Sequence, residues 1–277
     1  MIKLIVDCTC EIGTVEAAKM GIISLPMRMM IDDKEYLAGE NLDNDTFYDL
    51  LPKAKAAPKT MQINAHDYVQ VIKPLLDAGD QVFVMSVSSG LSGTFNSLTQ
   101  AAAELNSPNL VIFDSQTFTL AYYALAMEAK KLIDAGVTLT ELTTALEKLR
   151  DRVRIYFIAD TTKYLVKGGR ISFMKGFLAD TLHLKPIIGV VNKKLQMVGK
   201  GIGYNLAKRQ MMRFTQNVDE TMPIYYGHIH NSEKAEDFKQ IFKFDFTEKR
   251  EIGPIVGAHG GPNCVGLAFF EKIDEQK

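Results

Sequence analysis

The first 160 residues of this 277-residue chain alternate between short apolar runs and segments of helical periodicity. The runs are almost continuously apolar, which is typical of strands buried on both faces of a sheet. Strands that alternate with helices predict right-handed crossovers and a parallel sheet covered on both faces. The predicted strands are 2–6, 82–87, 110–113 and 155–159, together with a β-like run over 22–31 that Pro26 interrupts. The predicted helices are 15–20, 46–54, 67–78, 94–105, 120–135 and 138–151.

The pattern changes after residue 160. An Asn192-Lys193-Lys194 turn joins two predicted strands as a hairpin, which favours a mixed or antiparallel sheet. We therefore predict an α/β protein of two domains: a Rossmann-like parallel-sheet domain over residues 1–160 and an α+β domain over 161–277. The predicted strands of the second domain are 185–191, 195–198, 224–229, 251–256 and 265–270, and its predicted helices are 205–216 and 233–242.

Composition excludes several classes of protein. The balance of 32 basic against 33 acidic residues lacks the basic excess of a nucleic-acid binder. Three cysteines cannot form a disulfide framework, and they fit a reducing cytoplasm. The longest uncharged stretch, 252–270, contains two prolines and five glycines, so we interpret it as strand, Gly-rich loop and strand. We expect a cytoplasmic protein without an integral membrane segment.

The segment Ser88-Ser89-Gly90-Leu91-Ser92-Gly93-Thr94 lies between a predicted strand and a predicted helix. Free backbone N–H groups at a helix start, with hydroxyls around them, can form an anion site. The spacing is not that of a P-loop, and Thr94 stands where a nucleophile elbow needs glycine. From the spacing alone, an anion site and a tight turn with helix caps are equally good interpretations.

Residues 161–200 carry eight Lys or Arg and one acid, Asp180. This excess, which includes the Gly-rich Lys167–Arg170 loop, suits an anionic ligand or an acidic partner. A solvated basic face is the plainer alternative, and taken alone it is favoured.

Few residues suggest a metal or a catalytic base. His259 sits in a Gly-rich segment, although a lone histidine is more often structural. His228 and His230 alternate along a predicted strand without a third ligand nearby in sequence, and the pair of Cys8 and Cys10 lacks a second pair. We expect no metal site.

Taken in order, these segments resemble the DegV family of bacterial fatty-acid-binding proteins. The strongest matches are the intact Ser-Ser-Gly-Leu-Ser-Gly-Thr at 88–94 and Lys-Gly-Gly-Arg-Ile-Ser at 167–172. Each motif is modest alone, but together they run through the whole chain. The other matching segments are Asp7-Cys8-Thr9, Thr60-Met61-Gln62-Ile63, Asp114-Ser115, Lys185-Pro186-Ile187 and Gly253-Pro254 followed by Ala258-His259-Gly260-Gly261.

The resemblance implies a DegV-type fold with a long-chain fatty acid buried in a tunnel at or near the domain interface. It implies no cofactor and no catalysis by the chain itself. Such proteins are the substrate carriers of a separate, ATP-binding fatty acid kinase, which makes acyl phosphate for phospholipid synthesis. Transient contact with a membrane surface is compatible with that task.

The resemblance also assigns residues. Thr60, Ser92 and His259 would bind the carboxylate, and Arg170 would lie near the mouth, close to the phosphate or the kinase. Lys167 and Lys200 would share that docking role. The supporting residues near the carboxylate would be Ser88, Ser89, Gly93, Gln62 and Met61.

The chain departs from the family's motifs beside the proposed carboxylate site. Met61 stands for serine, Ile63 for proline and Gly260 for threonine, and Lys200 replaces an arginine common in relatives. Lysine lacks the bidentate geometry with which arginine binds phosphate. These departures bear on acyl preference and kinase pairing more than on the fold. Chain length, unsaturation and branching of the acid, the oligomeric state and the identity of the kinase stay open.

Two other functions fit parts of the sequence. A serine hydrolase of acyl esters would use Ser92 as nucleophile and His259 as base, although the elbow spacing is missing. A binder of non-lipid anions would dock a phosphorylated ligand or an acidic partner on the basic 161–200 segment. The Met-rich stretch 26–30 could line a tunnel, but an ordinary core is slightly favoured.

Overall fold

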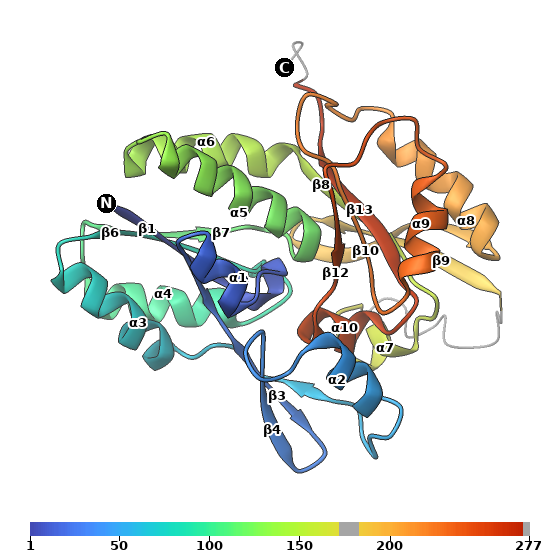
Figure 1. Cartoon of the computed structure of the whole chain (residues 1–277), viewed down its shortest axis with the longest axis horizontal. Coiled ribbons are helices and arrows are strands. Elements are labelled where there is room, and N and C mark those ends of the chain that lie inside the picture. Colours follow the sequence, from blue (N-terminus) through green and yellow to red (C-terminus); the bar gives the residue numbers. More distant parts are fainter. Residues whose placement is uncertain (172–182, 274–277) are drawn as a thin grey trace.

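The computed structural model of the chain describes residues 1–171 and 183–273 (Figure 1). A parallel sheet in the N-terminal half has the strand order β2-β1-β6-β7. Its central strands are apolar and buried, as the continuous apolar runs predict. The strands are β1 (Ile2–Asp7), β2 (Ile22–Leu25), β6 (Gln81–Ser86) and β7 (Leu110–Asp114).

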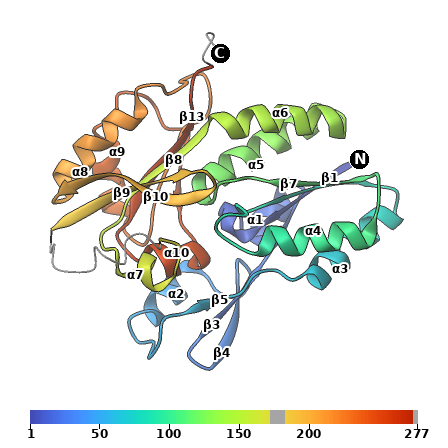
Figure 2. The same ribbon diagram turned by 180° about the vertical axis from the view of Figure 1, so that it is seen from behind.

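Helices cover both faces of the parallel sheet. Helices α3 (Ala65–Asp77) and α4 (Thr94–Leu105) pack on one face, and α5 (Thr119–Asp134) packs on the other against β1 (Figure 2). Helix α6 (Leu139–Arg152) packs on α5 and begins with the predicted capping box of Thr138 and Glu141. The layered α/β architecture is confirmed.

A mixed six-stranded sheet occupies the C-terminal half, in the order β10-β9-β8-β13-β11-β12. Only β11 and β12 pair in parallel. One side carries α8 (Tyr204–Met211) and α9 (Ser232–Lys239), and α5 packs against β8, β11 and β13 (Figure 1). The strands are β8 (Val153–Ile158), β9 (Leu184–Val191), β10 (Lys194–Ile202), β11 (Tyr225–His228), β12 (Glu248–Glu251) and β13 (Val265–Phe270).

A small sheet and several short elements complete the described structure. The small sheet has the order β4-β3-β5. The 3₁₀ helix η1 (Cys8–Cys10) follows β1, and η3 (Met212–Thr215) follows α8. The other elements are β3 (Met27–Ile31), β4 (Lys34–Ala38), β5 (Lys59–Thr60), α1 (Thr14–Lys19), α2 (Asn44–Leu50), α7 (Lys163–Lys167) and α10 (Pro254–Gly260).

The predicted hairpin between 185–191 and 195–198 is confirmed, because β9 and β10 are antiparallel neighbours. Both Asn192 and Lys193 have positive φ, at 50° and 66°. Two consecutive left-handed residues give the tight turn whose twist matches that of the flanking strands.

The prediction that strand 155–159 joins the parallel sheet is wrong. This strand, β8, pairs antiparallel with β13 and β9 instead of joining the parallel sheet. An apolar run indicates a buried strand but does not say which sheet it joins. The division into domains at residue 160 stays a prediction, although β8 precedes that point and pairs with strands that follow it.

Four other expectations differ from the structure. The run 22–31 is interrupted at Pro26 as expected, but its two parts, β2 and β3, lie in different sheets. The predicted helix 205–216 ends at Met211 and continues as η3. His230 lies beyond the end of β11, so it does not alternate with His228 along a strand. Thr60, in the connection between the predicted helices 46–54 and 67–78, lies on the short strand β5 instead of in a loop.

The Gly-rich segment after β12 is the most consequential difference. Residues 251–256 were predicted as a strand, but β12 ends at Glu251 and Pro254 opens α10. Proline is favoured at the first turn of a helix because its missing N–H would have no partner there. His259 therefore lies in the last turn of a helix and not in an irregular loop. Among the residues that the structure describes, no helix has the length and hydropathy to span a membrane.

Candidate functional site

A cavity with about 1120 Å³ of empty space, counting its mouth, opens among β5, the loop after β6, the start of α5, the six-stranded sheet and α10. Apolar side chains make most of its wall. Among the described lining residues there is no Asp or Glu. The apolar wall includes Met27, Phe118, Leu120, Ile155, Phe157 and Ile229.

Four of the residues predicted from the resemblance come from separate segments and all line this cavity. Thr9, Gln62, Thr119 and His228 are further polar residues of its wall. Thr60 comes from β5, Ser92 from the loop between β6 and α4, Arg170 from the residues after α7, and His259 from α10. Each segment is short and lies at the end of a regular element, where a side chain can point into a cavity without interrupting a sheet or a helix core. The fold thus brings together residues that are as much as 199 positions apart in sequence.

Thr60 and His259 form the centre of this polar group. The Oγ1 atom of Thr60 lies 3.0 Å from Nε2 of His259, within hydrogen-bond distance. Burial, followed by the positive charge of Arg170, lowers the pKa of His259 to about 4. The imidazole is therefore neutral at pH 7.

The tautomer of His259 follows from its surroundings. Its Nδ1 atom is buried and has no hydrogen-bond partner among the described residues. Gly168 lies against this atom so closely that a Cβ at position 168 would stand 2.2 Å from it. A buried N–H without an acceptor costs more than an unused lone pair, so the proton belongs on Nε2. Nε2 then donates to Thr60, and the Thr60 hydroxyl is left free to donate into the cavity.

Ser92 and Gln62 are held by their own contacts. The Oγ atom of Ser92 lies 2.8 Å from Oγ1 of Thr94 and accepts a hydrogen bond from the Thr94 backbone N–H at 3.2 Å. Gln62 donates to Oγ of Ser97 at 2.9 Å. Gly93 lies between them, where a Cβ would come within 2.0 Å of Gln62 Oε1. Met61 also lines the cavity and replaces a polar side chain there with an apolar one.

Of the three predicted basic residues, only Arg170 lines the cavity. Its guanidinium donates to the carbonyl oxygens of Gly168 at 2.6 Å and Leu91 at 3.4 Å, and the residue is exposed. Lys167, at the end of α7, and Lys200, on β10, are both exposed and lie outside the cavity wall.

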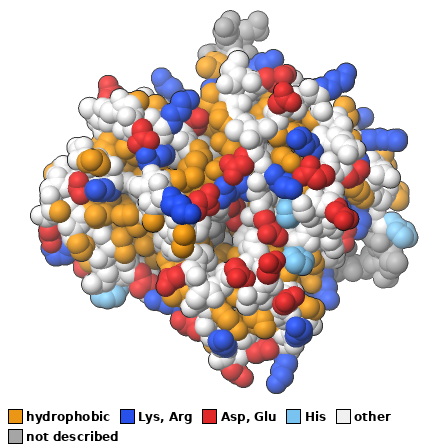
Figure 3. Space-filling model, viewed as in Figure 1, with side chains coloured by type: hydrophobic (Ala, Val, Ile, Leu, Met, Phe, Trp, Pro, Cys, Tyr) orange, Lys and Arg blue, Asp and Glu red, His pale blue; other side chains and the backbone are white. Residues whose placement is uncertain are grey.

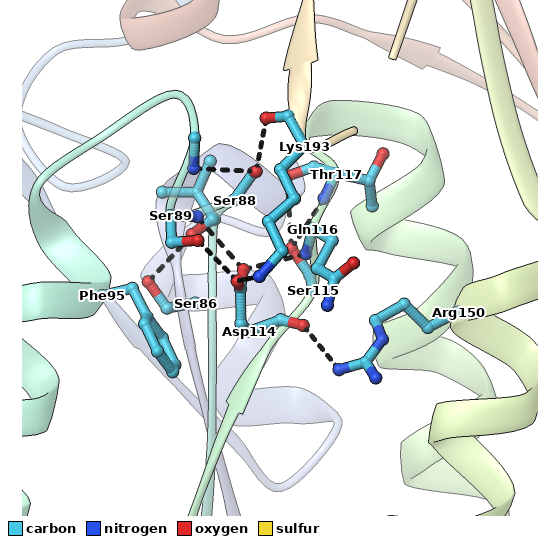
Figure 4. A network of polar contacts seen from close by, with 12 residues as sticks. Ser86, Ser88, Ser89, Phe95, Asp114, Ser115, Gln116, Thr117, Arg150 and Lys193 are labelled. Atoms are coloured by element: carbon cyan, nitrogen blue, oxygen red, sulfur yellow. Dashed lines mark hydrogen bonds and ion pairs between the residues drawn. The ribbon is translucent and has the colours of Figure 1, made fainter. Parts of the chain in front are cut away.

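Ser88 and Ser89 do not line the cavity and belong to a separate polar network (Figure 4). Ser88 is buried and donates to the carbonyl oxygen of Lys193 at 2.7 Å. Ser89 donates to Asp114 through both its backbone N–H and its hydroxyl, at 3.1 and 2.6 Å. These two serines therefore hold the loop, while Ser92 and Gly93 meet the cavity.

The family model described as an uncharacterised protein of the DegV family matches residues 1–272. This chain belongs to the DegV family. Among curated DegV relatives, a DegV domain-containing protein of Clostridium perfringens is 26% identical over 275 residues, covering 98% of this chain and 99% of the relative. The protein DegV of Bacillus subtilis is 27% identical over 282 residues, with 98% and 99% coverage.

Solved DegV structures have the same fold. The crystal structure of DegV from Bacillus subtilis, named a fatty acid binding protein, has a TM-score of 0.83 and 26% identity, covering 98% of this chain and 99% of that one. A DegV family protein from Thermus thermophilus, whose structure is named for its fatty acid binding, has a TM-score of 0.87 at 23% identity, with 98% and 99% coverage. At 23% identity, the similarity to the Thermus thermophilus protein shows the fold alone.

The contacts that a hydrolase would need are not formed in this DegV chain. The hydroxyl of Ser92 is engaged with Thr94, and Nε2 of His259 is engaged with Thr60. No hydrogen bond joins Ser92 to His259 in the described ranges. A serine nucleophile is ordinarily activated by a base within hydrogen-bond reach.

The alternative anion site on the 161–200 segment is partly neutralised. Lys185 pairs with Asp160 at 2.8 Å, and Lys193 pairs with Asp114 at 3.1 Å. Lys175 and Asp180 lie outside the described residues. Within residues 1–171 and 183–273, no group of three or more His, Cys, Asp or Glu is arranged to hold a metal ion.

A second hollow has the opposite electrostatic character. It lies on the face drawn in Figure 3, where acidic side chains gather around it. Glu40, Asp43, Asp45 and Glu251 are among its lining residues. A carboxylate would be repelled there, so the first cavity is the one that suits an acid.

Sequence reasoning missed part of the DegV site. Gly168 was noted only as a member of a Gly-rich loop, although its missing side chain makes room for His259. Phe118, Ile155 and Phe157 were not singled out in the sequence, and they line the cavity. An apolar residue that faces a cavity has the same pattern as one that faces the core, so no sequence signal separates them.

Proposed function

We propose that this chain binds a long-chain fatty acid in the cavity, with the carboxylate at Thr60, Ser92 and His259 and the acyl chain against the apolar wall. The observation that carries the proposal is a cavity with a mostly apolar wall that brings Thr60, Ser92 and His259 together, with no Asp or Glu among its described lining residues. Fatty acid binding by DegV of Bacillus subtilis supports it.

The energetics suit such a ligand. Burial of a methylene contributes about 0.8 kcal/mol, so an acyl chain of about 16 carbons gains on the order of 10 kcal/mol before the costs of association. A carboxylate is costly to bury unless donors reach it. The Thr60 hydroxyl, polarised by His259, is one such donor. The Ser92 hydroxyl is the second, with the Thr94 hydroxyl and backbone N–H donating to Ser92 Oγ and leaving its proton for the carboxylate. The charge of Arg170 adds a favourable field near the mouth.

The proposal extends to a carrier role. The bound carboxylate would be presented to a separate fatty acid kinase, which supplies ATP and metal and forms the acyl phosphate. Arg170 lies on the cavity wall and is exposed, so it can meet the transferred phosphoryl group or the kinase. Lys167 and Lys200 would add positive charge to the docking surface. The reaction itself would take place only in the complex.

Mass spectrometry of the purified protein tests the binding step, first under native conditions and then after solvent extraction. We expect a stoichiometric mass excess that extracts as one or a few fatty acids. Thr60→Ala and Ser92→Ala should each lower the retained fraction. Thr143→Ala is the matched control, because Thr143 is half-buried and its hydroxyl bonds only within α6. A protein that is empty and also rejects added fatty acids would refute the proposal.

The carrier step needs its own experiment. The loaded protein is mixed with a purified fatty acid kinase and ATP, and acyl phosphate is trapped with hydroxylamine. Arg170→Ala should keep the acid bound while acyl phosphate formation falls at least tenfold, the loss expected for one charged contact to a phosphate. Unchanged phosphorylation in Arg170→Ala and in Lys167→Ala would remove both residues from this role.

A further inference from the structure

We propose that the tip of the β9–β10 hairpin positions the loop that carries Ser92, and that Lys193 is the residue that does so. The proposal rests on the proposed function, because it concerns how well that loop holds a carboxylate. The loop between β6 and α4, residues 87–93, belongs to the parallel sheet, whereas the hairpin belongs to the six-stranded sheet. Figure 4 shows the two meeting at Ser88, Asp114 and Lys193.

Ser88 connects the hairpin to Ser92, because its hydroxyl contacts the hairpin and its carbonyl oxygen contacts the loop backbone. Its hydroxyl donates to the carbonyl oxygen of Lys193 at 2.7 Å. Its own carbonyl oxygen accepts from the backbone N–H groups of Leu91 at 3.0 Å and Ser92 at 3.1 Å. The backbone of Ser92 therefore depends on Ser88, whose side chain is fixed by the hairpin.

The side chain of Lys193 adds a second contact. Its Nζ atom lies 3.1 Å from Oδ2 of Asp114, whose side chain is only 8% exposed. The same carboxylate accepts from the backbone N–H and the hydroxyl of Ser89 and from the backbone N–H of Gln116, at 3.1, 2.6 and 3.0 Å. The ammonium group of Lys193 compensates the charge of the buried Asp114 carboxylate, which in turn holds the loop through Ser89. Removal of the ammonium group would leave that buried charge without an ionic partner.

The backbones on both sides are suited to this contact. Lys193 adopts φ of 66°, and its carbonyl oxygen accepts from Ser88 in the loop. Gly90 lies against that oxygen, where a Cβ would come within 2.3 Å of it. Any larger residue at position 90 would push the hairpin away. A close backbone approach and a half-buried ion pair therefore meet at one point of the hairpin.

The experiment compares Lys193→Met with Lys194→Met. Methionine keeps an unbranched side chain and removes the charge. Lys194 is the matched control, because it neighbours Lys193, is exposed, and has no side-chain hydrogen bond or ion pair in the described structure. Hydrogen–deuterium exchange of the peptide covering 88–94 reports the loop, and titration of the delipidated protein with palmitate reports the site.

In Lys193→Met we expect faster exchange in this peptide and roughly tenfold weaker palmitate binding, as for loss of one charge-assisted contact. Lys194→Met should match the wild type, and Lys193→Arg should restore most of the binding. Unchanged exchange, or faster exchange with unchanged affinity, would overturn the positioning role. The wild-type protein could instead bind no palmitate although peptide 88–94 still exchanges faster in Lys193→Met. That result would refute the proposed function, and with it the role of Lys193 in positioning a carboxylate site.

Discussion

Substitution of Gly168 by alanine gives a sharp test of the polar group in the cavity. The backbone of Gly168 has φ of −71°, which alanine adopts freely, so only the added methyl group matters. That methyl would stand 2.2 Å from Nδ1 of His259, far inside ordinary contact distance. The imidazole must therefore move by about 1 Å, because close-packed atoms cannot absorb such an overlap.

A shift of that size disturbs the hydrogen bond between Thr60 and His259. The Oγ1–Nε2 distance is 3.0 Å, and hydrogen bonds of this kind extend to about 3.2 Å. A neutral hydrogen bond contributes about 1 kcal/mol net, which corresponds to roughly fivefold in affinity. We expect Gly168→Ala to bind palmitate roughly fivefold more weakly, with a smaller change in melting temperature than a core cavity would cause.

Calorimetric titration of delipidated protein measures this loss, and a double-mutant cycle identifies its cause. In a His259→Ala background there is no ring to displace, so Gly168→Ala should have no further effect on affinity. Wild-type affinity in Gly168→Ala would refute the reasoning. The same fivefold loss in both backgrounds would refute it as well, because the methyl group would then act through something other than His259.

Three further predictions concern titration and reactivity. The pKa of His259 is about 4 in the folded state, so between pH 6.5 and 4 the unfolded chain binds a proton that the folded chain does not. Urea unfolding at pH 7 and pH 4.5 should therefore show a larger loss of unfolding free energy in the wild type than in His259→Asn. An equal loss in the two proteins would contradict this. Burial raises the pKa of Glu11 to about 7, so the stability that this group contributes is lost as pH rises from 4.5 to 7. The unfolding free energy of Glu11→Gln, taken relative to that of the wild type, should therefore be higher at pH 8 than at pH 5. The same difference between the two proteins at both pH values would refute the raised pKa. A serine-reactive fluorophosphonate should leave Ser92 unmodified by mass spectrometry, and labelling there would favour the hydrolase hypothesis.

Much of the fold could be predicted because its elements carry local signals. The parallel strands are continuous apolar runs, the hairpin has its Asn192-Lys193 turn, and α6 has its capping box. The errors arose where a local pattern has two outcomes. An apolar run such as 155–159 fits either sheet, and a Gly-rich segment after a strand fits a loop until Pro254 is given weight as a helix start.

The candidate site could be predicted only in part, for a related reason. Thr60, Ser92, Arg170 and His259 came from the resemblance, and the structure brings all four to one cavity. Spacing alone could not have joined them, because long-range proximity is set by how sheets dock. Ser88 and Ser89 share a motif with Ser92 yet turn toward Asp114 and Lys193, since neighbouring side chains in a tight loop point in different directions.

The distribution of the site over the fold links binding to the docking of the sheets. Thr60 belongs to the small sheet, Ser92 to a loop of the parallel sheet, and His259 to a helix between strands of the six-stranded sheet. In the proposed function all three would contact the carboxylate, so its affinity would depend on how the sheets are docked. The reverse holds by linkage: a ligand that binds only the docked state stabilises it, by about 2.7 kcal/mol at a hundredfold excess over Kd. The apolar lining of an empty cavity lacks packing partners on one side, and a bound acyl chain would supply there the contacts that a continuous core supplies elsewhere.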